Sequence, residues 1–206
     1  MKLLLATHNE HKRREFARLL ADPQGGRPLE IEALGADVKL PPEDGETFAE
    51  NALGKARAGA ALGKPCFADD SGIEAAALGG APGVRSARYA GESASDEENL
   101  QKLLREAPAG SRLQYVCAIA YVDPSEGVER MFEGRCRGRL AAEPRGERGF
   151  GYDPAFLPDE GPPAPEGGPA LTMAELSDEQ KDAISHRGRA ARALLAWLQE
   201  HAPTED

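Results

Sequence analysis

Cys66-Phe67-Ala68-Asp69-Asp70-Ser71-Gly72 is the stretch of this chain that says most about its fold. A short apolar run ends in two adjacent acids, a small hydroxyl residue and a glycine, a pattern typical of a buried strand that delivers carboxylates to its tip and then turns away. Carboxylates gathered at a strand end repel one another and destabilise the fold unless a positive group binds there. In a soluble protein the usual partner is Mg²⁺, often with a phosphate attached. The stretch therefore predicts a strand that ends at a candidate metal–phosphate site.

Size and charge narrow the class of protein. With 206 residues, 40% of them hydrophobic, the chain is long enough for one large domain or two small lobes that share a core. The formal net charge of -10 argues against a surface that coats nucleic acid, because such a surface would be basic. A local basic pocket for a small anion stays compatible with this charge.

Cysteines and apolar runs indicate the compartment. The three cysteines, Cys66, Cys117 and Cys136, are odd in number and widely spaced, so they suggest neither a disulfide framework nor a zinc site. The apolar run at residues 1–6 is too short for a signal peptide, and no segment approaches the ~20 apolar residues that cross a bilayer. We expect a soluble, cytoplasmic protein without a membrane partner.

The apolar pattern predicts a mixture of short β-α units and one long hairpin. Strands are expected over residues 2–7, 29–34 and 66–68, helices over 10–21, 47–61, from 95 onward and 178–201, a hairpin over 113–122 and 128–140, and loops over 22–26, 79–83 and 158–169. Thr47 and Glu50 stand at the spacing of a capping box. The pattern predicts an α/β fold over residues 1–206, with a mixed sheet, flanking helices and two lobes with a cleft between them.

Two regions offer positive charge for an anion. Thr7-His8-Asn9-Glu10-His11-Lys12 lies where a strand passes into a helix, so free backbone N–H groups and the Lys12 ammonium can attract phosphate. An ordinary polar helix cap would use the same residues. Lys55 could neutralise phosphate or be a solvated helix lysine. No Walker motif is present, because Gly63-Lys64 is followed by Pro65.

Carboxylates outside the 66–72 stretch are weaker candidates. Glu43 and Glu46 flank Gly45 in a loop, where acids are usually solvated and only sometimes bind a metal. Adjacent strand residues point to opposite faces, so at most one of Asp69 and Asp70 would face a given cleft. Asp70 is the better candidate because it is nearer to the expected turn.

Two later motifs could bind a flat polar ligand. Gly149-Phe150-Gly151-Tyr152-Asp153 frames aromatic rings with glycines, which suits stacking on a purine but also suits a turn with core-packed rings. Ser185-His186-Arg187 offers hydroxyl, imidazole and guanidinium donors for carbonyl or phosphate oxygens, or forms a surface patch. The histidines show no zinc spacing.

Taken together, the motifs resemble the inosine triphosphate pyrophosphatase family, whose members remove non-standard purine nucleoside triphosphates. They follow the family's order from the first strand to the last helix: Thr7-x-Asn9-x-x-Lys12, Glu43-x-Gly45-x-Thr47-Phe48-x-Glu50-Asn51-Ala52, Ala68-Asp69-Asp70-Ser71-Gly72, Pro82-Gly83-Val84-x-Ser86-Ala87-Arg88-Tyr89, Gly149-Phe150-Gly151-Tyr152-Asp153-Pro154-x-Phe156 and Ser185-His186-Arg187. Each motif alone is weak to moderate, but their joint occurrence is highly specific. One departure is the segment 158–169, which is longer and richer in proline and glycine than the family suggests.

The resemblance implies a role for each motif. Residues 7–12 and Lys55 would hold the triphosphate, Glu43 and Asp70 would bind Mg²⁺, Asp70 would also be the general base, and Ser71 would contact substrate. Phe150, Gly151, Tyr152 and Asp153 would form part of the nucleoside pocket, with Lys181, His186 and Arg187 reading the purine. The resemblance also implies an ITPase-like fold with two lobes around a deep central cleft, and a homodimer.

The expected reaction is hydrolysis of ITP, dITP or XTP to the nucleoside monophosphate and pyrophosphate. Three alternatives stay open from the residues alone. A related pyrophosphatase could act on standard or pyrimidine nucleotides, a nucleotide sensor could bind without turnover, and a phosphomonoesterase would release orthophosphate.

Overall fold

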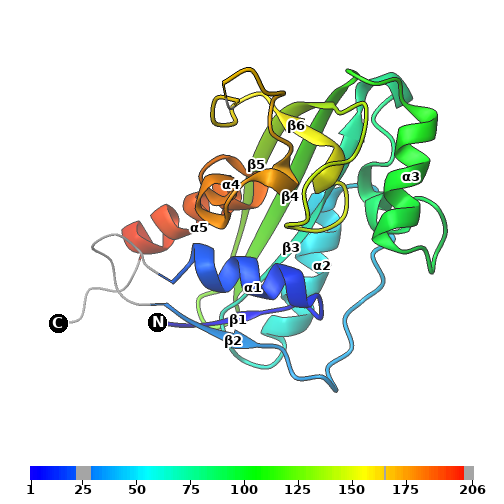
Figure 1. The fold of residues 1–206 in the computed structure, drawn as a ribbon. Helices are drawn as coiled ribbons and strands as arrows, with labels where there is room; N and C mark the ends of the chain where they lie inside the picture. The colour runs from blue at the N-terminus through cyan, green and yellow to red at the C-terminus, as the bar shows by residue number, and fades with distance from the viewer. Residues whose placement is uncertain (22–28, 165, 202–206) are drawn as a thin grey trace. The chain divides into compact units, whose positions relative to one another are not determined.

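A six-stranded sheet in the order β2-β1-β3-β4-β5-β6 is the framework of the fold (Figure 1). The computed structural model describes residues 1–21, 29–164 and 166–201. The strands are β1 (Lys2–Leu5), β2 (Glu30–Ala33), β3 (Cys66–Ala75), β4 (Arg112–Asp123), β5 (Val128–Leu140) and β6 (Phe156–Pro158). β1 pairs in parallel with β2 and β3, whereas β5 and β6 pair antiparallel. The predicted α/β class with a mixed sheet is therefore confirmed.

The helices begin where the sequence places caps. They are α1 (Glu10–Leu19), α2 (Phe48–Ala60), α3 (Asp96–Glu106), α4 (Asp178–Ile184) and α5 (His186–His201). The predicted capping box at the start of α2 is present, with Thr47 accepting from the Glu50 backbone N–H and Glu50 returning the contact. No helix of the described ranges is both long and apolar enough to span a membrane.

The chain divides into two compact units. The first unit comprises Met1–Asp70, Cys117–Gly134 and Arg189–Asp206, and the second comprises Ser71–Val116 and Arg135–Gly188. Each unit has its own apolar core, so burial in each can offset its own ordering entropy.

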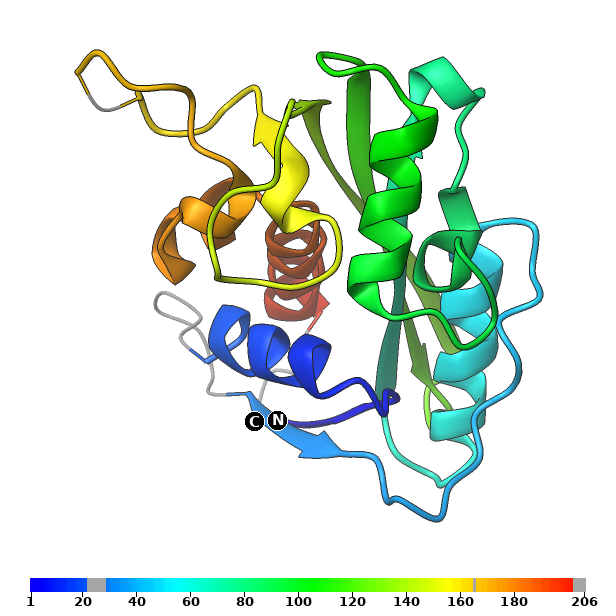
Figure 2. The same ribbon diagram turned by 45° about the vertical axis from the view of Figure 1, so that its right-hand side comes forward.

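In the first unit, helices cover both faces of the strands (Figure 2). One face packs against α1 and α5, and its core contains Leu3, Leu5, Phe16, Leu20, Phe67, Cys117, Ile119, Tyr121, Ala190, Ala191, Leu194 and Leu198. On the other face α2 approaches closely at Gly59, where an added Cβ would lie 2.4 Å from Cys66 Sγ. Residues of β3 therefore face α1 and α2 alternately.

In the second unit, α3 and the loops after β5 enclose the other core. Its largest members include Ile73 from β3, Leu100 and Leu103 from α3, and Phe156 from β6. Tyr115 on β4 belongs to this core and is 6% exposed.

Two predictions about segment ends are wrong. The strand that begins at Cys66 does not end at Ala68 but continues to Ala75, so Asp69 to Gly72 lie in a strand and not in a turn. Burial of Ile73 and Ala75 in the second core accounts for the continuation. The long helix over 178–201 is broken at Ser185, whose backbone is extended and whose Oγ accepts from Gly188 N at 3.0 Å.

The remaining segments agree with expectation where they are described. β4 and β5 are neighbours joined by the turn at 124–127, which confirms the predicted hairpin. Of the loop predicted over 158–169, Pro158 is the last residue of β6, whereas described residues 159–164 and 166–169 form neither helix nor strand. The loop predicted over 22–26 lies outside the described residues.

Candidate active site

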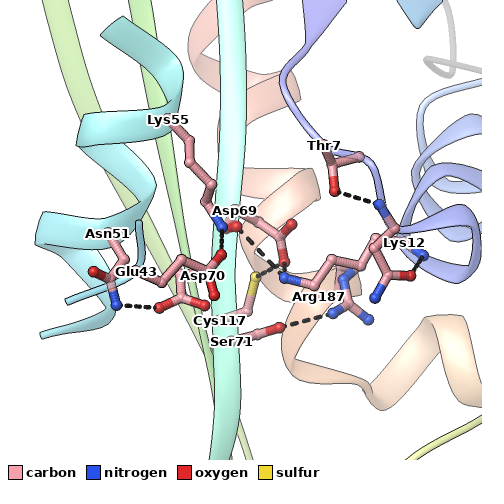
Figure 3. Close-up of polar contacts among 11 residues, drawn as sticks. Thr7, Lys12, Glu43, Asn51, Lys55, Asp69, Asp70, Ser71, Cys117 and Arg187 are labelled. Atoms are coloured by element: carbon pink, nitrogen blue, oxygen red, sulfur yellow. Dashed lines mark hydrogen bonds and ion pairs between the residues drawn. The ribbon is translucent and has the colours of Figure 1, made fainter. Parts of the chain in front are cut away.

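β3 carries adjacent acids into a group of opposite charges in the first unit (Figure 3). We call this group the acid–lysine cluster; it consists of Lys12, Glu43, Lys55, Asp69 and Asp70. Lys12 comes from α1, Lys55 from α2, and Glu43 from the segment before α2. The cluster thus gathers four charged residues of the sequence motifs, together with Lys55, around one strand.

Asp69 lies on the side of β3 that faces α1. Its side chain is fully buried, and Lys12 Nζ lies 3.1 Å from its Oδ2. The Cys117 thiol donates to the same oxygen at 3.9 Å (Figure 3). A buried carboxylate paired with an ammonium is far less costly than an isolated one. Asp69 therefore fixes the position of the Lys12 ammonium.

Asp70 lies on the α2 side of the strand and is held by Asn51. Asn51 Nδ2 donates to Asp70 Oδ2 at 2.8 Å, and Asn51 Oδ1 accepts from Gly45 N at 2.8 Å. Burial raises the pKa of Asp70, and the opposing effects of Lys12 and Lys55 do not fully offset it. A buried carboxylate with a raised pKa is a stronger base than a solvated one.

Glu43 and Lys55 form an ion pair between the loop and α2. Burial would raise the pKa of Glu43, but the Lys55 ammonium outweighs it, so the pKa lies below its ordinary value. Burial would likewise lower the pKa of Lys55, but the carboxylates of Asp69, Glu43 and Asp70 raise it. Lys55 is thus a cation that is 4% exposed and held by three acids.

The start of α1 is a conventional polar cap. Thr7 Oγ1 accepts from Asn9 N at 3.1 Å, and Asn9 Oδ1 accepts from Lys12 N at 3.1 Å. This geometry matches the helix-cap alternative and leaves the Thr7 and Asn9 side chains bonded to backbone. Of residues 7–12, the structure brings the Lys12 ammonium to the cluster.

The other residues of that segment are exposed. His8 Nε2 lies 2.9 Å from Val38 O, and Glu10 pairs with Arg13 at 2.7 Å. His11 is exposed on the first turn of α1. His8 and Glu10 are therefore engaged with Val38 and Arg13 at the surface of the first unit.

The second unit contains a separate polar group around Asp153. Asp153 is 3% exposed and accepts three hydrogen bonds. Tyr115 Oη donates to Oδ1 at 3.0 Å, while Lys181 Nζ and Phe150 N donate to Oδ2 at 2.8 and 3.1 Å. One buried carboxylate therefore fixes a lysine, a phenol and the loop that carries Phe150.

Phe150 lies against two of the predicted base readers. Its ring centroid is 5.4 Å from Lys181 Nζ and 5.7 Å from Arg187 Cζ. The loop requires Gly149, because its φ is +74° and an added Cβ would meet Asp153 Oδ2 at 2.1 Å. A phenyl ring beside two cations offers a face on which a flat ligand could stack.

Gly151 and Tyr152 anchor this loop instead of extending the polar group. Gly151 N donates to Asp96 Oδ2 at 2.9 Å. Tyr152 is buried, and its hydroxyl donates to Ser86 O at 2.8 Å. These two residues serve the conformation of the loop.

Ser71, His186 and Arg187 also belong to the second unit. Arg187 Nη2 donates to Ser71 Oγ at 2.8 Å, so the helix start reaches back to β3 (Figure 3). The His186 ring stacks on Tyr115 with centroids 4.6 Å apart and planes 8° apart. All three predicted residues are therefore held by specific partners.

Sequence reasoning assigned no role to three residues that organise these groups: Asn51, Asp69 and Tyr115. Asn51 is one turn before Lys55 on a helix face, and that spacing is a signal that could have suggested it. The contact of Tyr115 with Asp153 joins residues 38 positions apart, and no local pattern announces it.

The fold and the two polar groups define an α/β protein with a carboxylate–ammonium cluster carried on a central strand. The chain belongs to the Ham1 family, whose model matches residues 3–197. This membership bears out the resemblance drawn from the motifs.

Individual relatives match over nearly the whole chain. A dITP/XTP pyrophosphatase of Symbiobacterium thermophilum is 49% identical over 202 residues, covering 96% of this chain and 94% of that protein. A solved HAM1 protein from Coxiella burnetii superposes with a TM-score of 0.79 at 39% identity, covering 97% and 99% of the two chains. A nucleoside-triphosphatase, also called dITP/XTP pyrophosphatase, from Mycobacterium abscessus gives a TM-score of 0.70 at 42% identity, covering 95% and 99%.

Proposed function

We propose that this protein hydrolyses non-standard purine nucleoside triphosphates (dITP, ITP and XTP) to the monophosphate and pyrophosphate. The observation that carries the proposal is the acid–lysine cluster, in a chain 49% identical to a dITP/XTP pyrophosphatase. One buried and one partly buried ammonium group, those of Lys55 and Lys12, lie beside three carboxylates and suit a ligand that brings both negative charge and a cation.

Magnesium is the proposed cofactor, with Glu43 and Asp70 as its protein ligands. No three His, Cys, Asp or Glu side chains among the described residues are grouped so that they alone could hold a metal. Mg²⁺ usually keeps several waters and binds through one or two carboxylates plus substrate phosphates, so Glu43 and Asp70 fit its chemistry. When bound, the ion would withdraw charge from phosphate oxygens and acidify water.

The residues of the first unit would bind and activate. Lys12 and Lys55 would neutralise the triphosphate, and the positive end of the α1 helix dipole would add to the attraction. Asp70 would take a proton from the attacking water, a task helped by the raised pKa that burial gives it. Asp69 would act through Lys12, by holding its ammonium at 3.1 Å.

The residues around Asp153 would read the base. Phe150 would stack on the purine, and Lys181, His186 and Arg187 would present donors to its 6-oxygen, with Ser71 as a further contact. Adenine carries an amino donor at this position, so it would leave buried donors unpaired. Each such donor costs about 1–3 kcal/mol, which is roughly tenfold or more in preference.

The net charge of -10 supports a protein that does not coat nucleic acid.

The working form is proposed to be a cytoplasmic homodimer, as the family resemblance implies. Light scattering on the eluted peak of a sizing column measures the assembly, and a monomer at all concentrations would refute the dimer.

Initial rates of pyrophosphate release test the proposed activity. Purified protein with Mg²⁺ is given ITP, dITP, XTP, ATP, GTP and dTTP in parallel. Release from ITP, dITP or XTP, with little from ATP, is the expected result. Release of orthophosphate alone would indicate a phosphomonoesterase. Equal rates of pyrophosphate release from all six nucleotides would indicate a pyrophosphatase that also acts on standard nucleotides. Binding without turnover would indicate a nucleotide sensor.

A further inference from the structure

Tyr115 on β4 contacts two residues of the polar group around Asp153, although no motif includes it. Its hydroxyl donates to Asp153 Oδ1 at 3.0 Å, and its ring stacks on His186 at 4.6 Å with an interplanar angle of 8°. The other side of the ring packs on Phe156, with centroids 4.5 Å apart. The residue is 6% exposed, so these contacts fix its position.

The Tyr115 hydroxyl completes the fixation of Asp153. Oδ2 accepts from Lys181 Nζ and Phe150 N, whereas Oδ1 accepts from the phenol. Without the phenol, the carboxylate could rotate about its Cβ–Cγ bond and exchange its oxygens between Lys181 and Phe150. Burial raises the pKa of Tyr115 well above its ordinary value, so the phenol stays protonated and donates.

The Tyr115 ring acts on His186 in the same way. A nearly parallel stack restricts the tilt of the imidazole, and His186 is the first residue of α5. One side chain of the sheet therefore sets the orientation of a carboxylate and of an imidazole that come from different parts of the chain.

We propose that Tyr115 is a positioning residue for base recognition, because it fixes the Asp153 carboxylate through its hydroxyl and the His186 ring through its face. This inference rests on the proposed function, in which His186 and the two residues that Asp153 holds, Lys181 and Phe150, bind the base. It predicts that the hydroxyl affects substrate binding more than the chemical step.

Tyr115→Phe removes the hydroxyl and keeps the stacking face. Tyr121→Phe is the matched control, since Tyr121 lies on the same strand, is 3% exposed and donates to a carboxylate oxygen of Asp123 at 3.2 Å. Asp123 binds the turn residue Ser125 and has no part in the proposed site. Both variants lose one buried phenol–carboxylate hydrogen bond and should lose similar thermal stability.

The test compares KM and kcat for dITP in the two variants and titrates dIMP by calorimetry. For Tyr115→Phe we expect KM and the dIMP dissociation constant to rise about tenfold, with kcat within about twofold of the parent. Tyr121→Phe should leave all three unchanged. An unchanged KM in Tyr115→Phe, a fall in kcat without a rise in KM, or an equal rise in Tyr121→Phe would overturn the positioning role.

The same data separate this inference from the proposed function. If the parent protein releases no pyrophosphate from dITP, the proposed function fails, and the dIMP titration still tests Tyr115. If the parent is active and Tyr115→Phe binds dIMP equally well, only the positioning role fails. A parent protein that neither turns over dITP nor binds dIMP would overturn both.

Discussion

Asn51 Nδ2 donates to Asp70 Oδ2 at 2.8 Å, and this contact joins α2 to the acidic end of the first unit's β3 segment. Asn51 Oδ1 accepts from Gly45 N at 2.8 Å, so the same side chain also holds the loop that carries Glu43. Asn51 is 5% exposed. The two proposed metal ligands, Glu43 and Asp70, are thus connected through one buried amide side chain, which carries no charge.

Replacing Asn51 should reduce activity more than stability. Asn51→Ala removes both contacts, and loss of groups that orient metal ligands typically costs about 10–100-fold in metal affinity or activity. Asn51→Asp should be at least as harmful, because it places a second carboxylate against Asp70. The measurement is kcat/KM for dITP at saturating Mg²⁺.

Asn99→Ala is the control for Asn51. Asn99 is 2% exposed and binds backbone at Ala90 N and Ala87 O in the second unit. Its replacement should lower the melting temperature while kcat/KM stays within about threefold. Equal activity losses in Asn51→Ala and Asn99→Ala would show that Asn51 acts through stability alone.

Two glycines near this loop should respond in opposite ways. A Cβ at Gly45 would lie 2.7 Å from Asn51 Oδ1 and 2.9 Å from Glu50 Cβ, so Gly45→Ala should displace the loop and lower kcat/KM. Among the described residues outside the backbone of α2 itself, a Cβ at Gly54 would meet Pro41 Cγ alone, at 3.7 Å, and Gly54 lies inside α2. Gly54→Ala should therefore stabilise the protein by about 0.5–1 kcal/mol with activity unchanged. Urea unfolding measures the stability of both variants, and kcat/KM for dITP measures their activity. A fully active Gly45→Ala variant would refute the close contact between residue 45 and Asn51.

Removal of the metal should abolish pyrophosphate release, and added Mg²⁺ should restore it. Glu43→Gln should raise the Mg²⁺ concentration that gives half the maximal rate, because it removes one proposed carboxylate ligand. Glu46→Gln is the matched control, since Glu46 is an exposed acid on the other side of Gly45. Activity that persists in EDTA, or equal Mg²⁺ requirements in the two variants, would contradict the assignment of Glu43.

The thiol of Cys66 should make stability depend on pH in the alkaline range. Burial raises its pKa from 9.0 to about 12, a shift only partly countered by the Ala6 backbone. Between these values the folded state keeps a proton that the unfolded state loses, so the free energy of unfolding falls as pH rises, by at most about 1.4 kcal/mol per pH unit. Urea titrations of the parent and Cys66→Ala between pH 8 and 10.5 measure the difference. Parallel pH profiles would refute the shift.

The sequence predicts best where a local pattern has a local cause. The capping box at Thr47 and Glu50 involves residues three apart, and both the box and the helix after it are present. The β4–β5 hairpin follows from alternation around a turn. The extension of β3 to Ala75 has no such local cause. It depends on the burial of Ile73 in a core that contains residues of α3 and β5, which are distant in sequence.

The same distinction applies to the candidate site. Local position identifies Glu43, Lys55 and Asp70 as candidates. Glu43 lies in an acidic loop, Lys55 lies on the helix after that loop, and Asp70 follows an apolar run. Their arrangement depends on contacts across 12 and 19 positions, Lys55 with Glu43 and Asn51 with Asp70, which no periodicity encodes. The break at Ser185 was hidden because the residues on both sides have helical spacing.

Phosphorus NMR of dITP hydrolysis by the parent and by Asp70→Asn tests the central claim most directly. Because burial raises the pKa of Asp70, its ionised form opposes folding, so the neutral asparagine should keep or increase the free energy of unfolding. We predict dIMP and pyrophosphate in equal amounts from the parent, and no turnover by a folded Asp70→Asn. Orthophosphate as the parent's product, or a variant that retains the parent's rate, would contradict it.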